Sequence, residues 1–146
     1  MELTALESLT GHRFPGGGFA IEPYEDWLMR DVLGAPAGDG TRAHPIWAFA
    51  APQQSMGVTI DEIFELCGSS AADGPMLGDS SIELAEPLRL GHRYVVSGSI
   101  VAASRKRGRT VGTFDVVTFV ADTTDAAGAP AARLTNSFVF PRPGEP

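Results

Sequence analysis

The sequence contains a single cysteine, Cys67, among its 146 residues. One cysteine excludes an internal disulfide, and it argues against a cysteine-based metal site, because such sites need several thiolate or imidazole ligands at set spacings. We therefore expect no bound metal. Cys67 lies on the apolar face of a predicted helix, and we interpret it as a small hydrophobic residue of the core.

Long apolar runs are also absent, since no continuous apolar segment reaches the roughly 20 residues that a membrane helix needs. The N-terminal sequence MELTALESLT lacks the basic and apolar regions of a signal peptide, so the expected compartment is the cytoplasm. With 43% apolar and 20% charged residues, the composition is that of a globular protein. We expect one domain over residues 1–146, with residues 1–18 and 141–146 peripheral.

Positive charge is scarce: 11 lysines and arginines face 18 acidic residues, which gives a formal net charge of −7. This balance argues against nucleic acid as a partner. One basic cluster stands out around Gly108, and two interpretations of it are open. It is either a solvated hairpin turn or a small electropositive patch for an anion such as a nucleotide phosphate; its members are Arg105, Lys106, Arg107 and Arg109.

The segment from His44 to Gly68 is the longest apolar segment with helical character, and we expect the rest of the chain to cover it. Thr59 and Glu62 have the spacing of a capping box, and Gly68 supplies a helix end. Pro52 is expected to kink or restart the helix, because proline cannot donate a backbone hydrogen bond. Upstream, Pro23 to Leu33 is predicted as a helix with Trp27, Leu28, Val32 and Leu33 on one stripe.

After Gly68 every segment has the pattern of strand and turn. Strands are predicted at 80–85, 94–103, 110–122 and 132–140, with a short strand at 19–22. In the third of these, alternation places Thr113, Asp115, Val117, Phe119 and Ala121 on one face. The fold class is therefore α+β, a curved antiparallel sheet wrapped around a long central helix. So small a domain cannot cover both the second face and the edge of its sheet, and dimerisation is expected.

The second half of the chain resembles the MaoC-like, FAS1-type dehydratases, a family with the hot-dog fold. The resemblance lies in Glu86-Pro87-Leu88 at the end of a strand, the turn Arg89-Leu90-Gly91-His92, the basic hairpin, and the turn Asp125 to Gly128. Ala51-Pro52 is similar to the Ala-Pro that starts the family's central helix. The resemblance covers roughly residues 19–142 and lies in the order of elements more than in any one motif.

This resemblance implies a fatty-acyl thioester ligand, carried on coenzyme A or acyl carrier protein, with no separate cofactor. The implied reaction is reversible addition of water to an enoyl thioester, at the interface of a homodimer or of a heterodimer with another hot-dog subunit. The reaction needs a base for water, an acid for the α-carbon and a donor for the enolate oxygen.

Active members of the family carry an Asp and a His in a Gly-Asp-x-Asn-Pro-x-His setting. Here Gly38, Asp39 and His44 keep the spacing, whereas Thr41 and Arg42 replace the Asn and Pro. The resemblance implies Asp39 and His44 as the catalytic pair. In the alternative interpretation, Asp39 belongs to a Gly-Asp-Gly turn and His44 caps or packs at the helix start.

Five further residues of the central segment are candidates for substrate binding. Gln53, Gln54 and Ser55 are polar residues in apolar surroundings, so they either bond to the backbone or face the thioester. Trp47 and Phe49 either belong to the core or line an acyl channel.

Four functions are compatible with these residues. The first is a catalytic hydratase subunit that uses Asp39 and His44, and the second is a non-catalytic half that pairs with a separate active subunit. The third is an acyl thioesterase, and the fourth is a non-enzymatic acyl-binding module. The thioesterase would use Asp61 or Glu62, although both are also explained as first-turn charges favoured by the helix dipole. The incomplete motif favours the non-catalytic half.

Overall fold

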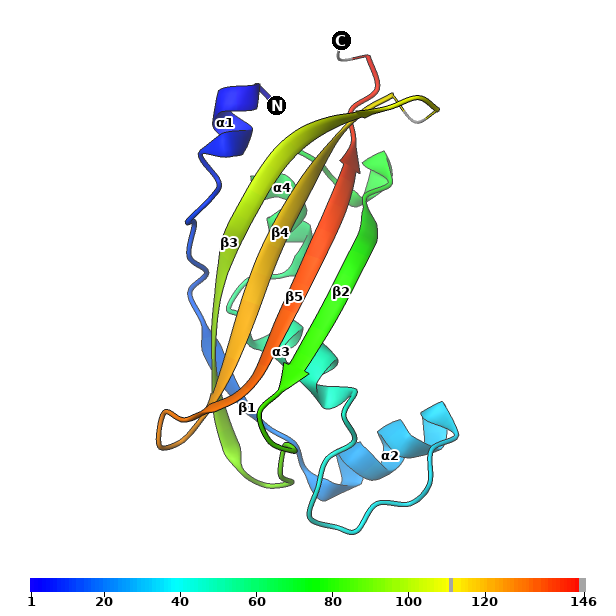
Figure 1. The fold of residues 1–146 in the computed structure, drawn as a ribbon. Helices are drawn as coiled ribbons and strands as arrows, with labels where there is room; N and C mark the ends of the chain where they lie inside the picture. The colour runs from blue at the N-terminus through cyan, green and yellow to red at the C-terminus, as the bar shows by residue number, and fades with distance from the viewer. Residues whose placement is uncertain (111, 145–146) are drawn as a thin grey trace.

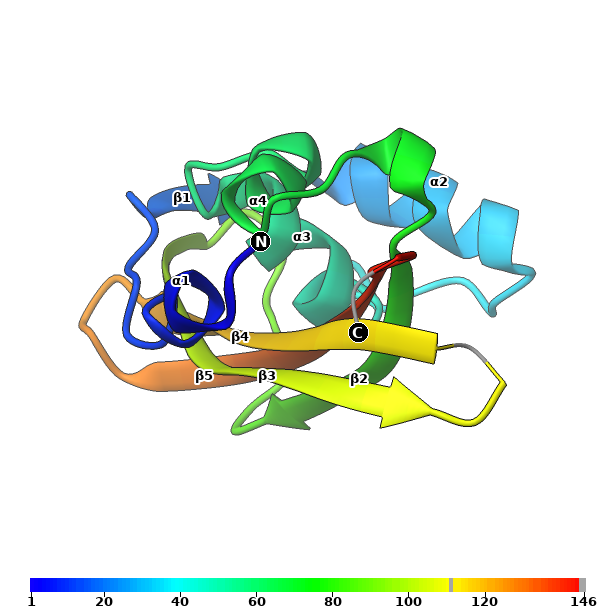
Figure 2. The same cartoon turned by 90° about the horizontal axis from the view of Figure 1, so that it is seen from above.

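The computed structural model describes residues 1–110 and 112–144 and shows one curved sheet with helices on its concave face (Figures 1 and 2). The elements follow in the order α1 (Leu3–Glu7), β1 (Gly17–Ala20), α2 (Pro23–Leu33), α3 (Trp47–Ser55), α4 (Ile60–Leu66), the 3-10 helix η1 (Ala71–Asp73), β2 (Met76–Leu84), β3 (Arg93–Gly108), β4 (Gly112–Asp125) and β5 (Pro130–Pro141). The predicted α+β architecture is confirmed. None of the helices in the described residues is long and apolar enough to cross a membrane.

The five strands form an antiparallel sheet in the order β1-β3-β4-β5-β2. The predicted alternation in β4 is confirmed, because its buried residues are every second one from Thr113 onward. β2 to β5 are longer than predicted, and the short strand β1 lies two residues earlier than predicted. β3 continues to Gly108 because Ser104 to Arg107 remain paired with Val116 to Thr113 of β4.

The core lies between the concave face of the sheet and α3 and α4. Phe64 of α4 packs edge-on against Phe138 and Phe140 of β5, and Phe138 stacks with Phe119 of β4. These aromatic pairs fix the helices to the middle of the sheet, since each ring buries a large apolar area. Cys67 is fully buried in the same cluster, as predicted.

The central helical segment is interrupted at a different place from the one predicted. Pro52 lies inside α3, which continues to Ser55, and the break comes at Gly57, whose φ of 74° is left-handed. Ala51-Pro52 therefore lies within α3 and does not start it. The second half is confirmed: Thr59 caps α4, and the Thr59 backbone N–H donates to Glu62 at 2.7 Å.

Helix α2 has the predicted bounds, with Pro23 in its first turn and Gly34 at its end in the left-handed conformation. Its apolar stripe does not face the core. The side chains of Trp27 and Val32 are 65% and 82% exposed, and Leu28 and Leu33 are also exposed. The buried residue of α2 is instead Asp26. The helix is held by a polar contact, and its apolar side faces outward.

Both terminal segments are more integrated than a peripheral role implies. Leu6, Leu9 and Phe14 are buried in the core cluster, and α1 packs against β3. Gly17 and Gly18 belong to β1, where a Cβ on Gly17 would lie 2.5 Å from the Ser55 carbonyl oxygen. At the other end Arg142 is buried, while residues 145 and 146 lie outside the described part of the chain.

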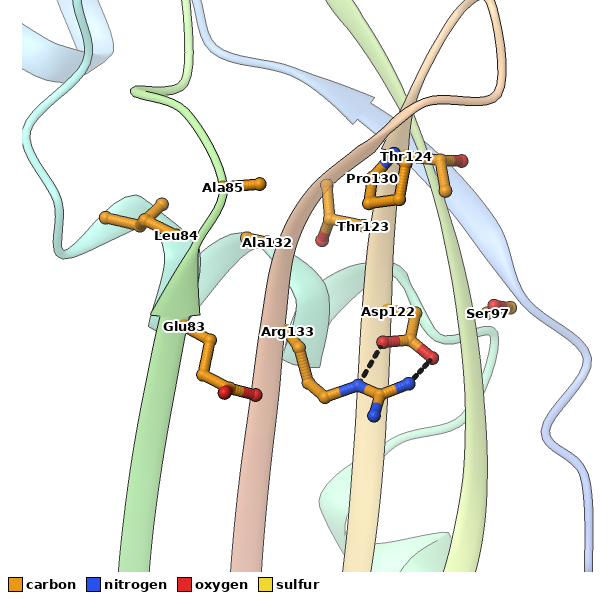
Figure 3. Close-up of a pocket in the computed structure, with 10 residues that line it drawn as sticks. All are labelled: Glu83, Leu84, Ala85, Ser97, Asp122, Thr123, Thr124, Pro130, Ala132 and Arg133. Atoms are coloured by element: carbon orange, nitrogen blue, oxygen red, sulfur yellow. Dashed lines mark hydrogen bonds and ion pairs between the residues drawn. The ribbon is translucent and has the colours of Figure 1, made fainter.

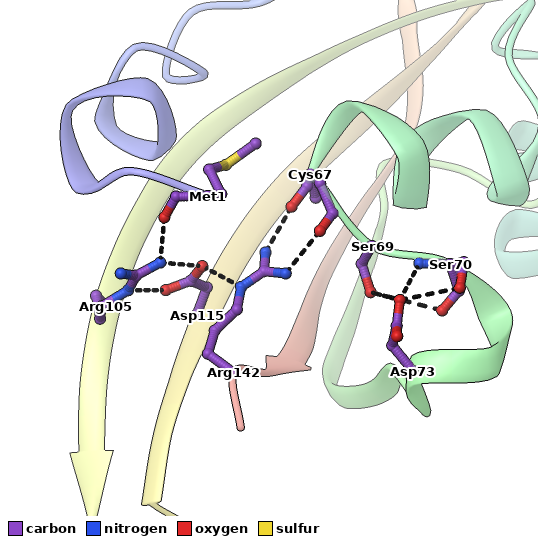
Figure 4. A network of polar contacts seen from close by, with 9 residues as sticks. Met1, Cys67, Ser69, Ser70, Asp73, Arg105, Asp115 and Arg142 are labelled. Atoms are coloured by element: carbon purple, nitrogen blue, oxygen red, sulfur yellow. Dashed lines mark hydrogen bonds and ion pairs between the residues drawn. The ribbon is translucent and has the colours of Figure 1, made fainter. Parts of the chain in front are cut away.

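Arg142 and Arg105 meet at Asp115, a fully buried carboxylate on the inner face of β4 (Figure 4). Arg142 also donates to the carbonyl oxygens of Cys67 and Gly68 at the end of α4, and Arg105 donates to the Met1 carbonyl oxygen. Arg105 is thus half-buried and engaged in this contact. Of the predicted basic cluster, only Lys106, Arg107 and Arg109 are exposed.

Candidate functional site

Asp39 lies in the exposed loop between α2 and α3, where its side chain stabilises its own turn. Its Oδ1 accepts hydrogen bonds of 2.8 Å from the backbone N–H groups of both Thr41 and Arg42. These two bonds, together with the nearby Arg42 charge, hold the pKa of Asp39 below its usual value. The carboxylate therefore stays ionised at neutral pH.

His44 is half-buried just before α3. Its Nδ1 accepts a hydrogen bond of 3.1 Å from the backbone N–H of Ile46, which is the N-cap position of the helix. Among the described residues no hydrogen bond joins the Asp39 carboxylate to the His44 ring. In the single chain each of the two predicted catalytic side chains instead accepts hydrogen bonds from nearby backbone N–H groups.

Asp26 on α2 is the carboxylate that contacts this region, and it was not among the predicted site residues. Its Oδ1 accepts from the His44 backbone N–H at 2.7 Å and from Trp47 Nε1 at 3.0 Å, while its Oδ2 pairs with Arg30 at 2.7 Å. Burial acts to raise the pKa of Asp26, but these hydrogen bonds and the Arg30 charge outweigh it and lower the pKa. The i, i+4 spacing of Asp26 and Arg30 was the available sequence signal.

A chain of hydrogen-bonded polar side chains runs from the edge of the sheet to α3. Ser80 of β2 donates to the Asn136 Oδ1 at 2.6 Å, Asn136 Nδ2 donates to Gln53 Oε1 at 3.1 Å, and Gln53 Nε2 donates to the Phe49 carbonyl oxygen at 3.0 Å. Asn136 is fully buried on β5. Of the five predicted substrate-binding residues, Gln53 thus has a buried partner.

The other four predicted substrate-binding residues have varied positions. Gln54 is exposed, and Ser55 is half-buried with its carbonyl oxygen against β1. Trp47 and Phe49 are half-buried, and Trp47 is tied to Asp26 through its ring N–H. The contact with Asp26 explains the position of Trp47, and none of these observations tests a role of the four residues in ligand binding.

The structure has a hollow of about 580 Å³ where β2 ends and β5 begins (Figure 3). Asp122 and Arg133 cross it as a two-point ion pair of 2.6 and 2.9 Å. Thr123 also lines it, and the buried Thr123 Oγ1 has no hydrogen-bond partner among the described residues. None of the predicted site residues lines this hollow.

A smaller hollow of about 190 Å³ adjoins the His44 segment. Ala43 and Pro45, on either side of His44, form one wall, and residues 84–88 form the other. Leu84 and Ala85 line both hollows, so the two lie side by side at the end of β2. This wall includes Glu86-Pro87-Leu88, one of the motifs in which the chain resembles the dehydratases.

Cys67 is unsuited to nucleophilic chemistry. Burial raises the pKa of its thiol to about 12, so it stays protonated at neutral pH. The described residues contain no group of three or more His, Cys, Asp or Glu side chains placed to hold a metal ion.

No protein-family model matches the sequence, and no curated protein is significantly similar to it. Solved structures do match. The ChsH1-ChsH2 complex from Mycobacterium tuberculosis superposes with a TM-score of 0.70 at 11% identity, covering 99% of this chain and 92% of that chain. The HadBC (3R-hydroxyacyl-ACP dehydratase) complex from the same organism gives a TM-score of 0.68 at 10% identity, with 90% and 96% covered.

A MaoC-like dehydratase from Rhodospirillum rubrum adds a TM-score of 0.59 at 19% identity, over 92% of this chain and 94% of that chain. The protein has the hot-dog fold. At these identities the likeness shows the architecture alone, and the hot-dog fold hosts more than one chemistry. In this hot-dog sheet the strand order makes β2 an edge strand, and both hollows lie at its end.

Proposed function

We propose that this protein is a MaoC-like hot-dog subunit that binds an enoyl or 3-hydroxyacyl thioester, carried on coenzyme A or acyl carrier protein, as the non-catalytic half of a hydratase. The ligand class is supported by the likeness to HadBC, which is a 3R-hydroxyacyl-ACP dehydratase. The two similar complexes each contain two different chains, which supports a separate hot-dog partner.

One observation carries the non-catalytic role: the carboxylate of Asp39 and the Nδ1 of His44 both accept backbone hydrogen bonds of their own loop. A general base must reach the proton that it abstracts, and a hydrogen bond that the imidazole N–H donates to a carboxylate is what orients such a histidine. In this chain Asp39 is exposed and points its Oδ1 at its own turn. Base and acid would then come from the partner subunit.

The thioester would lie beside the end of β2, where Leu84 and Ala85 line both hollows. The smaller hollow is lined almost entirely by apolar residues, which suits an acyl chain, and the more polar larger hollow holds Arg133, a cation for an anionic carrier. The thioesterase alternative has less support. Glu62 accepts the Thr59 backbone N–H and hydroxyl, so its carboxylate is occupied in capping α4.

The test measures hydration and binding separately. Purified protein alone is mixed with a panel of enoyl-CoA substrates, and loss of the enoyl-thioester absorbance is followed; calorimetric titration with the saturated acyl-CoA measures binding. We expect no hydration and saturable binding that Leu84→Asp weakens at least tenfold. Hydration by the protein alone that both Asp39→Ala and His44→Ala abolish would contradict the non-catalytic role, and absence of binding would contradict the ligand class.

A further inference from the structure

The inner side of β2 carries an apolar stretch that begins at the smaller hollow. Leu84 lines that hollow, and Ile82, two residues earlier, lies on the same face because side chains alternate along a strand. Their partners on β5, Ala132 and Leu134, are buried, so this face is turned toward the helix layer. Leu84 and Ile82 are each 41% exposed, so a large part of both side chains is free to contact a ligand.

This apolar stretch ends at the next inward position of β2, which is Ser80. The Ser80 hydroxyl donates to Asn136 Oδ1, and Asn136 Nδ2 donates to Gln53 Oε1 of α3. Asn136 is fully buried, whereas Ser80 is exposed at the strand edge. The pairing of β2 with β5 also shifts register just past this point, between Leu77 and Asp79. We call the three hydrogen-bonded side chains the polar boundary.

A hydrocarbon chain gains affinity from apolar contacts and loses it against buried polar groups. Each methylene group that is fully removed from water strengthens binding about fourfold. A methylene placed between Asn136 and Gln53 would separate two hydrogen-bonded amides, and an unpaired buried donor or acceptor costs more than one methylene contributes. An acyl chain that follows β2 from the smaller hollow would therefore gain affinity as far as the polar boundary and none beyond it.

The distance from Leu84 to Ser80 sets the length of chain that fits. These positions are four residues apart, which is about 13 Å along a strand. An extended polypeptide advances about 3.5 Å over the three backbone bonds of one residue, so a zigzag of single bonds covers this distance in about eleven bonds. The apolar stretch thus accommodates an acyl chain of up to about ten carbons.

We propose that the polar boundary of Ser80, Asn136 and Gln53 limits the acyl group that this protein binds to about ten carbons. The inference rests on the proposed function for the thioester ligand and for its place at the end of β2. It adds the substrate class, which is short-chain and medium-chain acyl thioesters, and the residues that determine it. Gln53 then contributes to binding by excluding longer chains and not by contacting the thioester.

The test is a series of ligands of increasing chain length. Calorimetric titration measures the dissociation constants of saturated acyl-CoAs from butanoyl to tetradecanoyl, each below the concentration at which it forms micelles. We expect the affinity to rise about twofold or more per methylene up to decanoyl and to rise no further up to tetradecanoyl. Affinity that still rises at tetradecanoyl would overturn this inference alone. If no acyl-CoA binds, the proposed function fails and this inference fails with it.

Two variants move the limit in opposite directions. Asn136→Leu with Gln53→Met replaces both amides with apolar side chains of similar size, so neither is left without its partner. It should raise the ratio of tetradecanoyl to octanoyl affinity at least tenfold. Ile82→Asn brings the polar boundary two residues closer to Leu84 and should lower the ratio of decanoyl to butanoyl affinity at least tenfold. Because Ile82 is exposed, this second variant leaves the core intact.

The matched control is Thr118→Val with Ser137→Ala, which removes a hydrogen-bonded pair of hydroxyl groups from β4 and β5. Ser137 follows Asn136 in the sequence and lies on the opposite face of the sheet. Both affinity ratios should keep their wild-type values in this control. Urea denaturation establishes that each variant is folded, and Ile82→Asn alone decides the point if the double variant is not. Unchanged ratios in the folded test variants, or equal changes in the control, would overturn the proposal.

Discussion

Asp26 is the residue on which the geometry of the α2–α3 region depends. Its carboxylate, 2% exposed, accepts from Arg30, from the His44 backbone and from Trp47 Nε1. Truncation would leave a mostly buried arginine and two N–H groups without their acceptor. Removing one partner of a buried ion pair costs more than the pair contributes, because the other charge stays desolvated.

We expect Asp26→Ala to lower the free energy of unfolding by about 2 to 4 kcal/mol. Asp26→Asn should cost less, because the amide oxygen still accepts from His44 and Trp47. Urea denaturation followed by circular dichroism measures both. The matched control is Asp31→Ala, an exposed carboxylate on the same helix, which should change stability by less than about 0.5 kcal/mol. Equal effects at positions 26 and 31 would contradict the assigned role.

The same carboxylate has a defined pH dependence. Its pKa in the folded protein lies below its usual value of 3.8, so its ionised form is favoured by folding. This contribution is fully present above this unfolded pKa of 3.8 and is lost as the pH falls through the lower folded pKa. The difference in unfolding free energy between wild type and Asp26→Asn should be constant from about pH 5 to pH 8 and shrink below about pH 4. If this difference in unfolding free energy grew on acidification, it would contradict a lowered pKa of Asp26 in the folded protein.

At the scale of elements, the sequence patterns predicted the features that are set locally. Pro23 and Gly34 bound α2, Thr59 and Glu62 cap α4, and alternation gave the inner face of β4, because each depends on a few neighbouring residues. The direction that α2 faces could not be predicted in this way. Its apolar stripe indicated burial, but what fixes the helix is a contact between Asp26 and residues 18 and 21 positions later.

The candidate site was less predictable than the fold for the same reason. The spacing of Asp39 and His44 is a local pattern, whereas whether the two side chains meet depends on how the loop between them is held. Asp39 bonds to its own loop, and Asp26 holds the His44 backbone from another element. The polar contact of Gln53 with Asn136 spans 83 residues and leaves no local signal.

The packing of β3 against the helix layer depends on the absence of a side chain at Gly98. A Cβ there would lie 2.9 Å from Phe14 Cδ2, 3.0 Å from Met56 Sδ and 3.3 Å from the Val120 carbonyl oxygen. We expect Gly98→Ala to lower the free energy of unfolding by about 1 to 3 kcal/mol, because the two core side chains must move. Ser99→Ala, next in sequence and on the outer face, is the control and should change little. Unfolding curves for the pair decide the point, and equal stability would mean that the core has room to adjust.

At the scale of the whole molecule, Asp115 joins both ends of the described chain to the central helix. Burial acts to raise its pKa, but the hydrogen bonds and charges of Arg105 and Arg142 lower it overall. Through these two arginines one carboxylate reaches Met1 and the last turn of α4. The alternation in β4 placed Asp115 among inward residues, and a charged residue in such a position indicates a buried partner.

Substitution of Arg142 and of Arg133 compares the contribution of a buried ion pair to stability with that of a surface ion pair. Arg142 is almost fully buried against Asp115, whereas Arg133 and Asp122, with side chains 52% and 36% exposed, form an ion pair of similar length at the surface. We expect Arg142→Ala to lower the free energy of unfolding by about 3 kcal/mol and Arg133→Ala by less than about 1 kcal/mol. Chemical denaturation in low and high salt provides the measurement, and only the surface pair should respond to salt. If the two variants lost equal stability, the charge at position 142 would not be what holds the chain ends to the central helix.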